Sequence, residues 1–426
     1  MKILITGGRV IDPAHKIDGR RDILVENTRI SRVGKDIKAK TDKVIDASGK
    51  IVIPGLVDMH VHLREPGRED KETVESGTKA ALKGGITSVL AMPNTNPAID
   101  SAENLGLLKK IIKNTAQANV FIAGAITKGR LGKELSDIAG LKKLGMIAIT
   151  DDGSSVDNQE LLKEALEISK QQGILVISHC EDKLLSASGV VNLGVISTRL
   201  GLRGISRESE YKRVERDIKL AGQTGARLHI AHVSLAESVD LVARAKKKGL
   251  KVTCETAPHY FSLSEEAVLE YDTNMKMNPP LRTKKDVRSV REGLKNGTID
   301  IIASDHAPHT EYEKEIEFDR AEFGVTGLET ELAASVTELI NPGILTWKEL
   351  VEKLSLNPSA LLNIDRGTLG PGKEADITVV SAEKEWIVQK EDLVSKSKNS
   401  PFLGRKFLGA VEYTIRSGKI VYQPAV

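Results

Sequence analysis

Apolar and polar positions in the middle of the chain follow two alternating patterns. Short apolar runs, typical of strands buried on both faces, are separated by longer stretches with the spacing of amphipathic helices. The strand-like runs are Leu56–Val61, Thr87–Met92, Val120–Ile126, Met146–Thr150, Ile174–Ser178, Arg227–Ala231, Lys251–Glu255 and Asp300–Ser304. The helical stretches include Glu72–Lys83, Asn158–Gln171, Val214–Thr224 and Ala236–Lys248. Repeated strand–helix units over about 250 residues predict an α/β fold, a TIM (β/α)8 barrel, and a doubly wound open sheet is the less favoured alternative.

Both ends of the chain show short strand-like runs separated by turn residues. They are Lys2–Ile5, Asp22–Val25, Ile30–Val33, Lys43–Ile45 and Ile51–Ile53 at one end, and Asp376–Val380, Ala410–Arg416 and Lys419–Tyr422 at the other. Because chain termini often lie close together, we expect the two ends to form one small β-sandwich domain. That domain would comprise residues 1–54 plus 366–426, beside a catalytic barrel of residues 55–365.

The amino-acid composition limits the kinds of molecule that this chain is expected to bind. The formal net charge of +3 and the aromatic content of 3% provide neither the field nor the stacking surface expected for nucleic acid. No apolar run is long enough to span a membrane, and the first residues lack the pattern of a signal peptide. Cys180 and Cys254 lie in or beside apolar strands and are expected to be buried free thiols. We therefore expect a cytoplasmic protein that acts on a small molecule.

Candidate metal ligands follow several of the predicted strands. His60 and His62 are two residues apart at the end of the first strand, so their side chains should point to the same face. His179, His232 and Asp305 follow the fifth, sixth and eighth strands. In a (β/α)8 barrel the carboxyl ends of all strands open at one mouth, where active sites lie. The pattern therefore predicts one cluster of imidazoles and carboxylates.

Such a cluster has ligands enough for two metal ions, which can together activate one nucleophile. One metal would take His60, His62 and Asp305, and the other would take His179 and His232. Asp152, at the end of the fourth strand, is favoured as the bridging ligand over Asp151, which should point elsewhere. Taken singly, the histidines could be core residues and Asp305 a turn residue, but their common position favours a metal site. The same alternation predicts that His229 and His306 face away, and it leaves His259 at the mouth without a partner.

The sequence around these positions resembles the class I bacterial dihydroorotases of the amidohydrolase superfamily. The motifs that carry the resemblance are Asp-Met-His-Val-His-Leu-Arg-Glu-Pro-Gly at 58–67, Met-Pro-Asn-Thr at 92–95, Thr-Asp-Asp-Gly at 150–153, Ser-His-Cys-Glu at 178–181, Ala-His-Val-Ser at 231–234, Asn-Pro-Pro-Leu-Arg at 278–282 and Ser-Asp-His-Ala-Pro-His at 304–309. With the tail Gly-Pro-Gly-Lys-Glu-Ala-Asp-Ile at 370–377, the resemblance covers essentially the whole chain.

The resemblance implies a reversible, zinc-dependent cyclisation of N-carbamoyl-L-aspartate to L-dihydroorotate and water in de novo pyrimidine biosynthesis. It implies one or two Zn²⁺ per subunit, with ligands His60, His62, Asp152, His179, His232 and Asp305. Asp305 would also be the catalytic acid and base. The implied substrate-binding residues are Arg64, Asn94 and His309 for the carboxylate, and Asn278 with the backbone of Phe323 and Gly324 for the ring. A homo-oligomer and a complex with aspartate carbamoyltransferase are further expectations.

Two alternatives stay open at this point. The first is a related cyclic amidase for hydantoins, dihydropyrimidines or allantoin, but such enzymes usually bridge their metals with a carboxylated lysine. Here Asp152 holds that position, and Lys128 follows the neighbouring strand. The second is a barrel that has lost catalysis and serves as a scaffold. The long connections Asp182–Glu215 and Thr310–Thr330 could be lids or ordinary surface loops.

Overall fold

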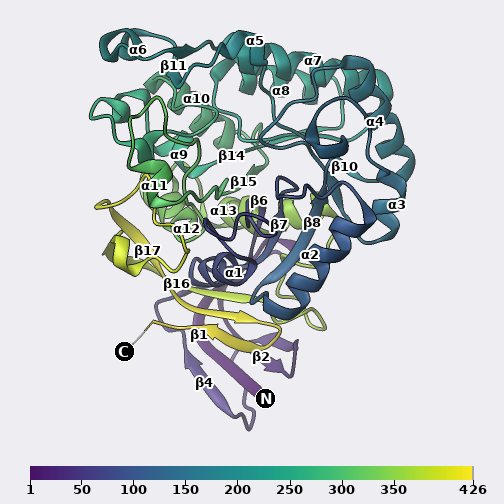
Figure 1. Ribbon diagram of the computed structural model, residues 1–426. Coiled ribbons are helices and arrows are strands. Elements are labelled where there is room, and N and C mark those ends of the chain that lie inside the picture. Colours follow the sequence, from purple (N-terminus) through teal and green to yellow (C-terminus); the bar gives the residue numbers. More distant parts are fainter. Residues whose placement is uncertain (425–426) are drawn as a thin grey trace.

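The computed structural model describes residues 1–424, and its centre is a barrel of eight parallel strands (Figure 1). In barrel order the strands are β6 (Leu56–Val61), β7 (Ile86–Ala91), β8 (Asn119–Gly124), β9 (Ala148–Ile149), β10 (Leu175–Ser178), β13 (Leu228–Ile230), β14 (Val252–Thr256) and β15 (Ile301–Ile302). Each strand pairs in parallel with the next one. All eight predicted strands and the (β/α)8 barrel are therefore confirmed.

The barrel closes between its first and last strands at their carboxyl ends. Val61 forms an isolated parallel bridge with His306, and the backbone N–H of His62 donates to the carbonyl of His306 at 2.9 Å. Below this bridge, the buried carboxylate of Asp58 accepts from the backbone N–H groups of His60 at 3.0 Å and Ser304 at 3.3 Å. Closure thus fixes the two chain segments that carry the predicted ligands of the first metal.

Helices cover the outside of the barrel (Figure 1). The longer ones are α1 (Val74–Lys83), α2 (Ala102–Thr115), α4 (Gln159–Gln172), α7 (Glu208–Thr224), α8 (Ala236–Lys247) and α10 (Lys284–Lys295). The shorter ones are α3 (Ile138–Lys143), α5 (Lys183–Ser186), α6 (Val195–Leu200), α9 (Pro258–Ser262), α11 (Glu311–Lys314), α12 (Glu331–Ser335), α13 (Trp347–Val351) and α14 (Asn357–Leu362). Local signals set their ends: Asn158 caps α4 with its side chain, and Gly173 ends that helix in a left-handed conformation.

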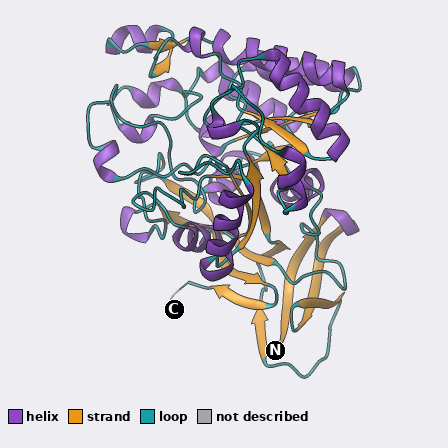
Figure 2. Cartoon of the chain, turned by 45° about the vertical axis from the view of Figure 1, so that its right-hand side comes forward, coloured by secondary structure: helices purple, strands orange, loops and turns teal. Residues whose placement is uncertain are grey.

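The strands of the two chain ends join in one continuous hydrogen-bonded sheet, which lies below the helix-covered barrel in Figure 2. Its strands are β1 (Lys2–Asp12), β2 (Ile17–Glu26), β3 (Arg29–Gly34), β4 (Lys43–Asp46), β5 (Ile51–Pro54), β16 (Ile377–Ile387), β17 (Lys406–Arg416) and β18 (Lys419–Tyr422). The two ends meet where β5 pairs antiparallel with β16. Ile3, Val52 and Ile377 belong to a core of this sheet that is separate from the barrel core. The prediction that both chain ends join in one strand-rich sheet is confirmed, whereas the domain limits of residues 1–54 plus 366–426 stay a prediction.

Two expectations from composition can be compared with the structure. Cys180 and Cys254 are both free and buried, as expected. Within residues 1–424, no helix has the length and apolar character needed to cross a membrane.

The contact at Gly84 gives a stability prediction for the barrel. Gly84 ends α1 with φ −75°, which alanine can adopt, but a Cβ atom there would lie 2.0 Å from the carbonyl oxygen of Leu328. We expect Gly84→Ala to lower the free energy of unfolding by about 1–3 kcal/mol because the backbone must shift. Urea denaturation of the purified variant measures this change.

Gly106 provides the matched control. It lies in α2, where an added Cβ would meet no atom within 4 Å, so Gly106→Ala should stabilise the protein by about 0.5–1 kcal/mol. If Gly84→Ala is as stable as Gly106→Ala, the close contact between Gly84 and the Leu328 carbonyl does not limit the stability of the barrel.

Candidate active site

The two histidines of the first barrel strand share two carboxylates. His60 Nε2 lies 3.3 Å from Asp152 Oδ1 and 3.5 Å from Asp305 Oδ1. His62 Nε2 lies 3.4 Å from Asp152 Oδ2 and 3.4 Å from Asp305 Oδ1. All four side chains are buried. The two-residue spacing therefore places both imidazoles on one face, as predicted, and barrel closure supplies Asp305 opposite them.

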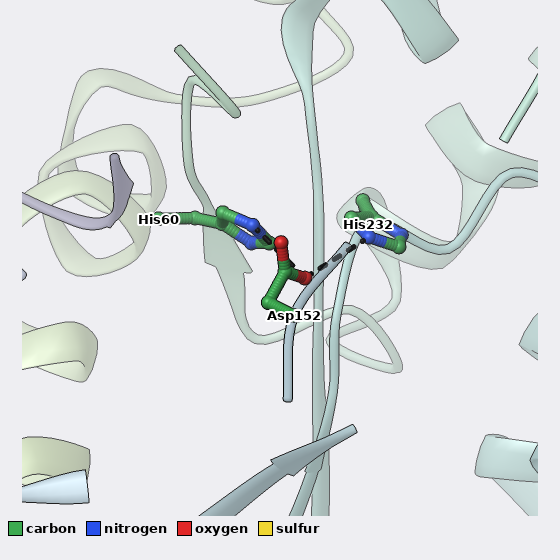
Figure 3. A group of neighbouring side chains, drawn as sticks. All are labelled: His60, Asp152 and His232. Atoms are coloured by element: carbon green, nitrogen blue, oxygen red, sulfur yellow. Dashed lines mark ion pairs between the residues drawn. The ribbon is translucent and has the colours of Figure 1, made fainter. Parts of the chain in front are cut away.

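A second pair of histidines lies on the other side of Asp152. His179 Nδ1 and His232 Nε2 are 2.9 Å apart, and each lies 3.6 Å from Asp152 Oδ1. Figure 3 shows the Asp152 carboxylate between the rings of His60 and His232. Asp151 points elsewhere, since its carboxylate accepts from the backbone N–H of Thr127 at 3.0 Å. The structure thus brings the six predicted ligands together with Asp152 in the central position.

The donor set fits a divalent cation. Two groups have ligand atoms that lie within 4.8 Å of one another: His60, Asp152 and His232 in one, and His60, His62 and Asp305 in the other. His179 contacts Asp152 but belongs to neither group. Within residues 1–424, His60 Nε2 and Asp152 Oδ1 are buried atoms without a hydrogen-bond partner. Buried polar atoms of this kind require a partner, and imidazole nitrogen with carboxylate oxygen suits Zn²⁺.

The electrostatics of the cluster favour a positive charge at its centre. Burial tends to lower the pKa of His60, but the carboxylates of Asp152, Glu255 and Asp305 outweigh burial and raise it well above its usual value. Burial tends to raise the pKa values of Asp152 and Asp305, but the surrounding imidazoles hold both below the ordinary range. The two carboxylates are therefore ionised, which is the form that binds metal.

Arg64 and His309 lie together at the mouth of the barrel. Arg64 Nη2 is 3.2 Å from His309 Nε2, and Arg64 Nε donates to the carbonyl of Pro308 at 3.0 Å. His309 Nε2 is also 2.8 Å from the carbonyl oxygen of Phe323. In the described part of the chain Arg64 has no ion-pair partner. Burial lowers its pKa to about 10, so the guanidinium stays charged at neutral pH.

The two asparagines predicted to bind substrate contact the outer edges of the histidine cluster. Asn94 Oδ1 lies 2.8 Å from His62 Nδ1. Asn278 Nδ2 donates to Glu181 Oε2 at 3.0 Å, and that oxygen lies 3.4 Å from His179 Nε2. Both asparagines therefore connect the mouth of the site to rings of predicted metal ligands, and their role toward substrate stays a prediction.

The prediction that His229 faces away was wrong. Strand β13 ends at Ile230 and His232 has a φ of 34°, so side chains do not alternate regularly between positions 229 and 232. His229 is buried, and its Nε2 lies 3.1 Å from Glu255 Oε2. His306, in contrast, points away from the cluster as expected, with its Nε2 3.2 Å from Glu72 Oε2.

Sequence reasoning missed Glu255. Its Oε1 lies 2.5 Å from His60 Nδ1, the nitrogen that faces away from Asp152. The available signal was its place at the end of the predicted seventh strand, the only carboxylate in that run. Nothing in the local sequence indicated that the side chain reaches past the eighth strand to the first.

Comparisons with known proteins agree with this geometry. A family model described as "Dihydro-orotase-like" matches residues 49–238. A dihydroorotase of Elusimicrobium minutum (strain Pei191) is 52% identical over 420 residues, which cover 99% of this chain and 97% of that protein. The chain belongs to the dihydroorotase family. Another dihydroorotase, of Geobacter metallireducens, is 53% identical over 424 residues and covers 99% of this chain and 100% of the relative.

The fold extends beyond the dihydroorotase family. The solved structure of an L-hydantoinase (dihydropyrimidinase) from Arthrobacter aurescens has a TM-score of 0.91 and 25% sequence identity, and covers 100% of this chain and 96% of that one. This chain and the hydantoinase thus share the barrel and the terminal sheet.

The shared position of His60 leads to a prediction on metal content. Because His60 belongs to both candidate groups, we expect His60→Ala to retain roughly half or less of the wild-type zinc after loading and dialysis. Elemental analysis of the dialysed protein measures the content. His15→Ala is the control, since His15 lies on the terminal sheet and is 43% exposed. Equal zinc in His60→Ala and His15→Ala would rule out these two groups as the binding site.

Proposed function

We propose that this chain catalyses the reversible, zinc-dependent cyclisation of N-carbamoyl-L-aspartate to L-dihydroorotate and water, a step of de novo pyrimidine biosynthesis. One observation supports this substrate above all: the half-buried, charged Arg64, two residues after His62, has no ion-pair partner among residues 1–424. Dihydroorotate carries a carboxylate next to its ring, and a guanidinium binds a carboxylate with two parallel hydrogen bonds. Membership of the dihydroorotase family supports the same reaction.

The proposed zinc ligands divide into two sets around Asp152. His60, His62 and Asp305 would hold one ion, and His179 with His232 would hold the other, with Asp152 as the bridge. When bound, zinc lowers the pKa of water and polarises a carbonyl group. One or two ions per subunit are consistent with this arrangement.

Asp305 is proposed as the acid and base of the reaction. In ring opening, Asp305 accepts a proton from the attacking water as the new carbon–oxygen bond forms. As the ring carbon–nitrogen bond breaks, the same carboxyl group gives the proton to the leaving nitrogen. The surrounding imidazoles lower the pKa of Asp305, so its carboxylate is ionised before water attacks. Ring closure runs the same proton transfers in reverse.

The remaining proposed contacts hold the substrate in place. Arg64, His309 and Asn94 would bind the carboxylate, while Asn278 and the backbone of Phe323 and Gly324 would contact the ring. The contact between Arg64 and His309 supports a shared carboxylate site. Fixing the carboxylate also fixes the distance from the ring carbonyl to Asp305, which is the main contribution of binding groups to the rate.

The hydantoinase alternative has less support. A bridging lysine would have to come from near the cluster, and Lys128 instead forms an ion pair with Glu134 and has an exposed side chain. Asp152 occupies the position between the histidine pairs. A hydantoin substrate would also leave Arg64 without a carboxylate to bind.

Three further predictions concern the cellular location and the assembly of the protein. We propose a cytoplasmic location, a homo-oligomeric state and a complex with aspartate carbamoyltransferase, the preceding enzyme of the pathway. Size-exclusion chromatography with light scattering, alone and after addition of that enzyme, tests the last two. A monomer that does not shift on mixing would contradict both.

The role of Arg64 can be tested by substrate discrimination. Loss of a charge-assisted pair costs about 1.5–3 kcal/mol, so Arg64→Gln should lower kcat/KM for dihydroorotate by about 10- to 100-fold. Residual hydrolysis of dihydrouracil, which lacks the carboxylate, should change little. Steady-state kinetics with both substrates provide the comparison.

Arg199→Gln is the control for that experiment, because Arg199 is an exposed residue of α6 without an ion-pair partner in the described chain. It should match wild type on both substrates. An Arg64→Gln variant that loses activity equally toward dihydroorotate and dihydrouracil would contradict a carboxylate-binding role for Arg64.

A further inference from the structure

A chain of buried polar side chains runs behind His60, on the side away from Asp152. His60 Nδ1 lies 2.5 Å from Oε1 of Glu255 at the end of β14. The other oxygen of Glu255 lies 3.1 Å from His229 Nε2, and His229 Nδ1 lies 2.8 Å from the hydroxyl of Thr253. Glu255 is 1% exposed and His60 and His229 are fully buried. These three side chains are therefore shielded from bulk solvent.

The direction of each hydrogen bond follows from the chemistry of the groups. Each oxygen of Glu255 faces an imidazole nitrogen, at 2.5 Å and 3.1 Å, so both hydrogen bonds are complete without a proton on the carboxylate. An ionised carboxylate only accepts hydrogen bonds, so His60 donates from Nδ1 and His229 donates from Nε2. His229 Nδ1 then accepts from the Thr253 hydroxyl. A neutral His60 that carries its proton on Nδ1 has its lone pair on Nε2, which faces Asp152 and Asp305.

We propose that Glu255 is a positioning residue of the metal centre: held by His229, it fixes His60 in the tautomer and ring orientation that present the Nε2 lone pair to the metal. This inference rests on the proposed function, because it requires a metal at the cluster. Carboxylates that accept from the second nitrogen of a metal-bound histidine orient the ring and raise its basicity, and losing one weakens metal binding by about 10- to 100-fold.

The two histidines of the first strand differ in this respect. His62 Nδ1 has a neutral acceptor, Asn94 Oδ1, at 2.8 Å, whereas His60 has a carboxylate. His60 belongs to both candidate metal groups and His62 to only one. Glu255, the charged acceptor, therefore contacts His60, the one histidine that both candidate metal groups contain. Removing Glu255 should weaken zinc binding more than removing the Asn94 side chain does.

Glu255→Gln is the decisive variant because it preserves size and removes only the ability to accept from both imidazoles. A glutamine has one acceptor oxygen, and its amide must donate. Either His60 or His229 must then change its tautomer or lose its partner. A purely space-filling role for Glu255 would survive this change.

Glu331→Gln is the matched control. Glu331 is also buried, in α12, and its carboxyl oxygens have no hydrogen-bond partner within residues 1–424. Burial raises the pKa of Glu331 well above its usual value, and glutamine is close to it in size and shape. Its substitution should leave zinc affinity unchanged.

The experiment measures zinc dissociation constants by competition with a chromophoric chelator. We expect about 10- to 100-fold weaker zinc binding in Glu255→Gln and smaller losses in His229→Gln and Asn94→Ala. In zinc-loaded wild type, a downfield proton signal from His60 Nδ1–H should be visible by NMR, and it should be absent in Glu255→Gln and present in Glu331→Gln.

The outcomes separate this inference from the proposed function. A wild-type protein that binds no zinc would overturn the proposed function together with this inference. The inference alone would be overturned if wild type binds zinc and Glu255→Gln binds it with equal affinity and shows the same proton signal. If Glu255→Gln fails to fold, His229→Gln provides the test instead. Wild-type zinc affinity in His229→Gln would overturn the proposed positioning role of Glu255.

Discussion

Closure of the barrel between its first and last strands is the constraint on which the site depends. The only bridge that joins these strands in the described structure links Val61 and His306, at the carboxyl ends where the chain turns toward the mouth. His62 and Asp305 are the immediate neighbours of the bridged residues, so closure itself sets the 3.4 Å contact between their side chains. Asp58 reinforces the same seam from below through backbone N–H groups on both sides.

Charge balance explains how so many ionisable groups can be buried together. Asp152 and Asp305 share their charge with four histidines, and Glu255 shares its charge with two, one of which is His60. Burying one of these carboxylates alone would be costly, but each has imidazole partners that offset the loss of water. His60 contacts all three carboxylates, which explains why a cation is favoured at this point. His232 and Asp305 have positive φ values of 34° and 49°, a strained backbone conformation that the surrounding packing must stabilise.

The sequence predicted the parts of this arrangement that depend on local pattern. Apolar runs located all eight barrel strands, although β9 and β15 are shorter than predicted because few of their backbone groups pair. Two-residue spacing placed His60 and His62 correctly, since both lie on one continuous strand. Alternation failed at His229 because the strand ends before His232. The contact between Glu255 and His60 joins residues 195 positions apart, and no local pattern encodes the reach of one side chain past a neighbouring strand.

The most direct test of the account is ring opening of L-dihydroorotate by the zinc-loaded protein, compared with the Asp305→Asn variant, each with and without aspartate carbamoyltransferase. The account predicts turnover by wild type, and a kcat lowered by about 10²- to 10⁴-fold in the variant at unchanged thermal stability. Absence of turnover by zinc-loaded wild type in both mixtures would contradict it. So would an Asp305→Asn variant that turns over dihydroorotate at the wild-type rate.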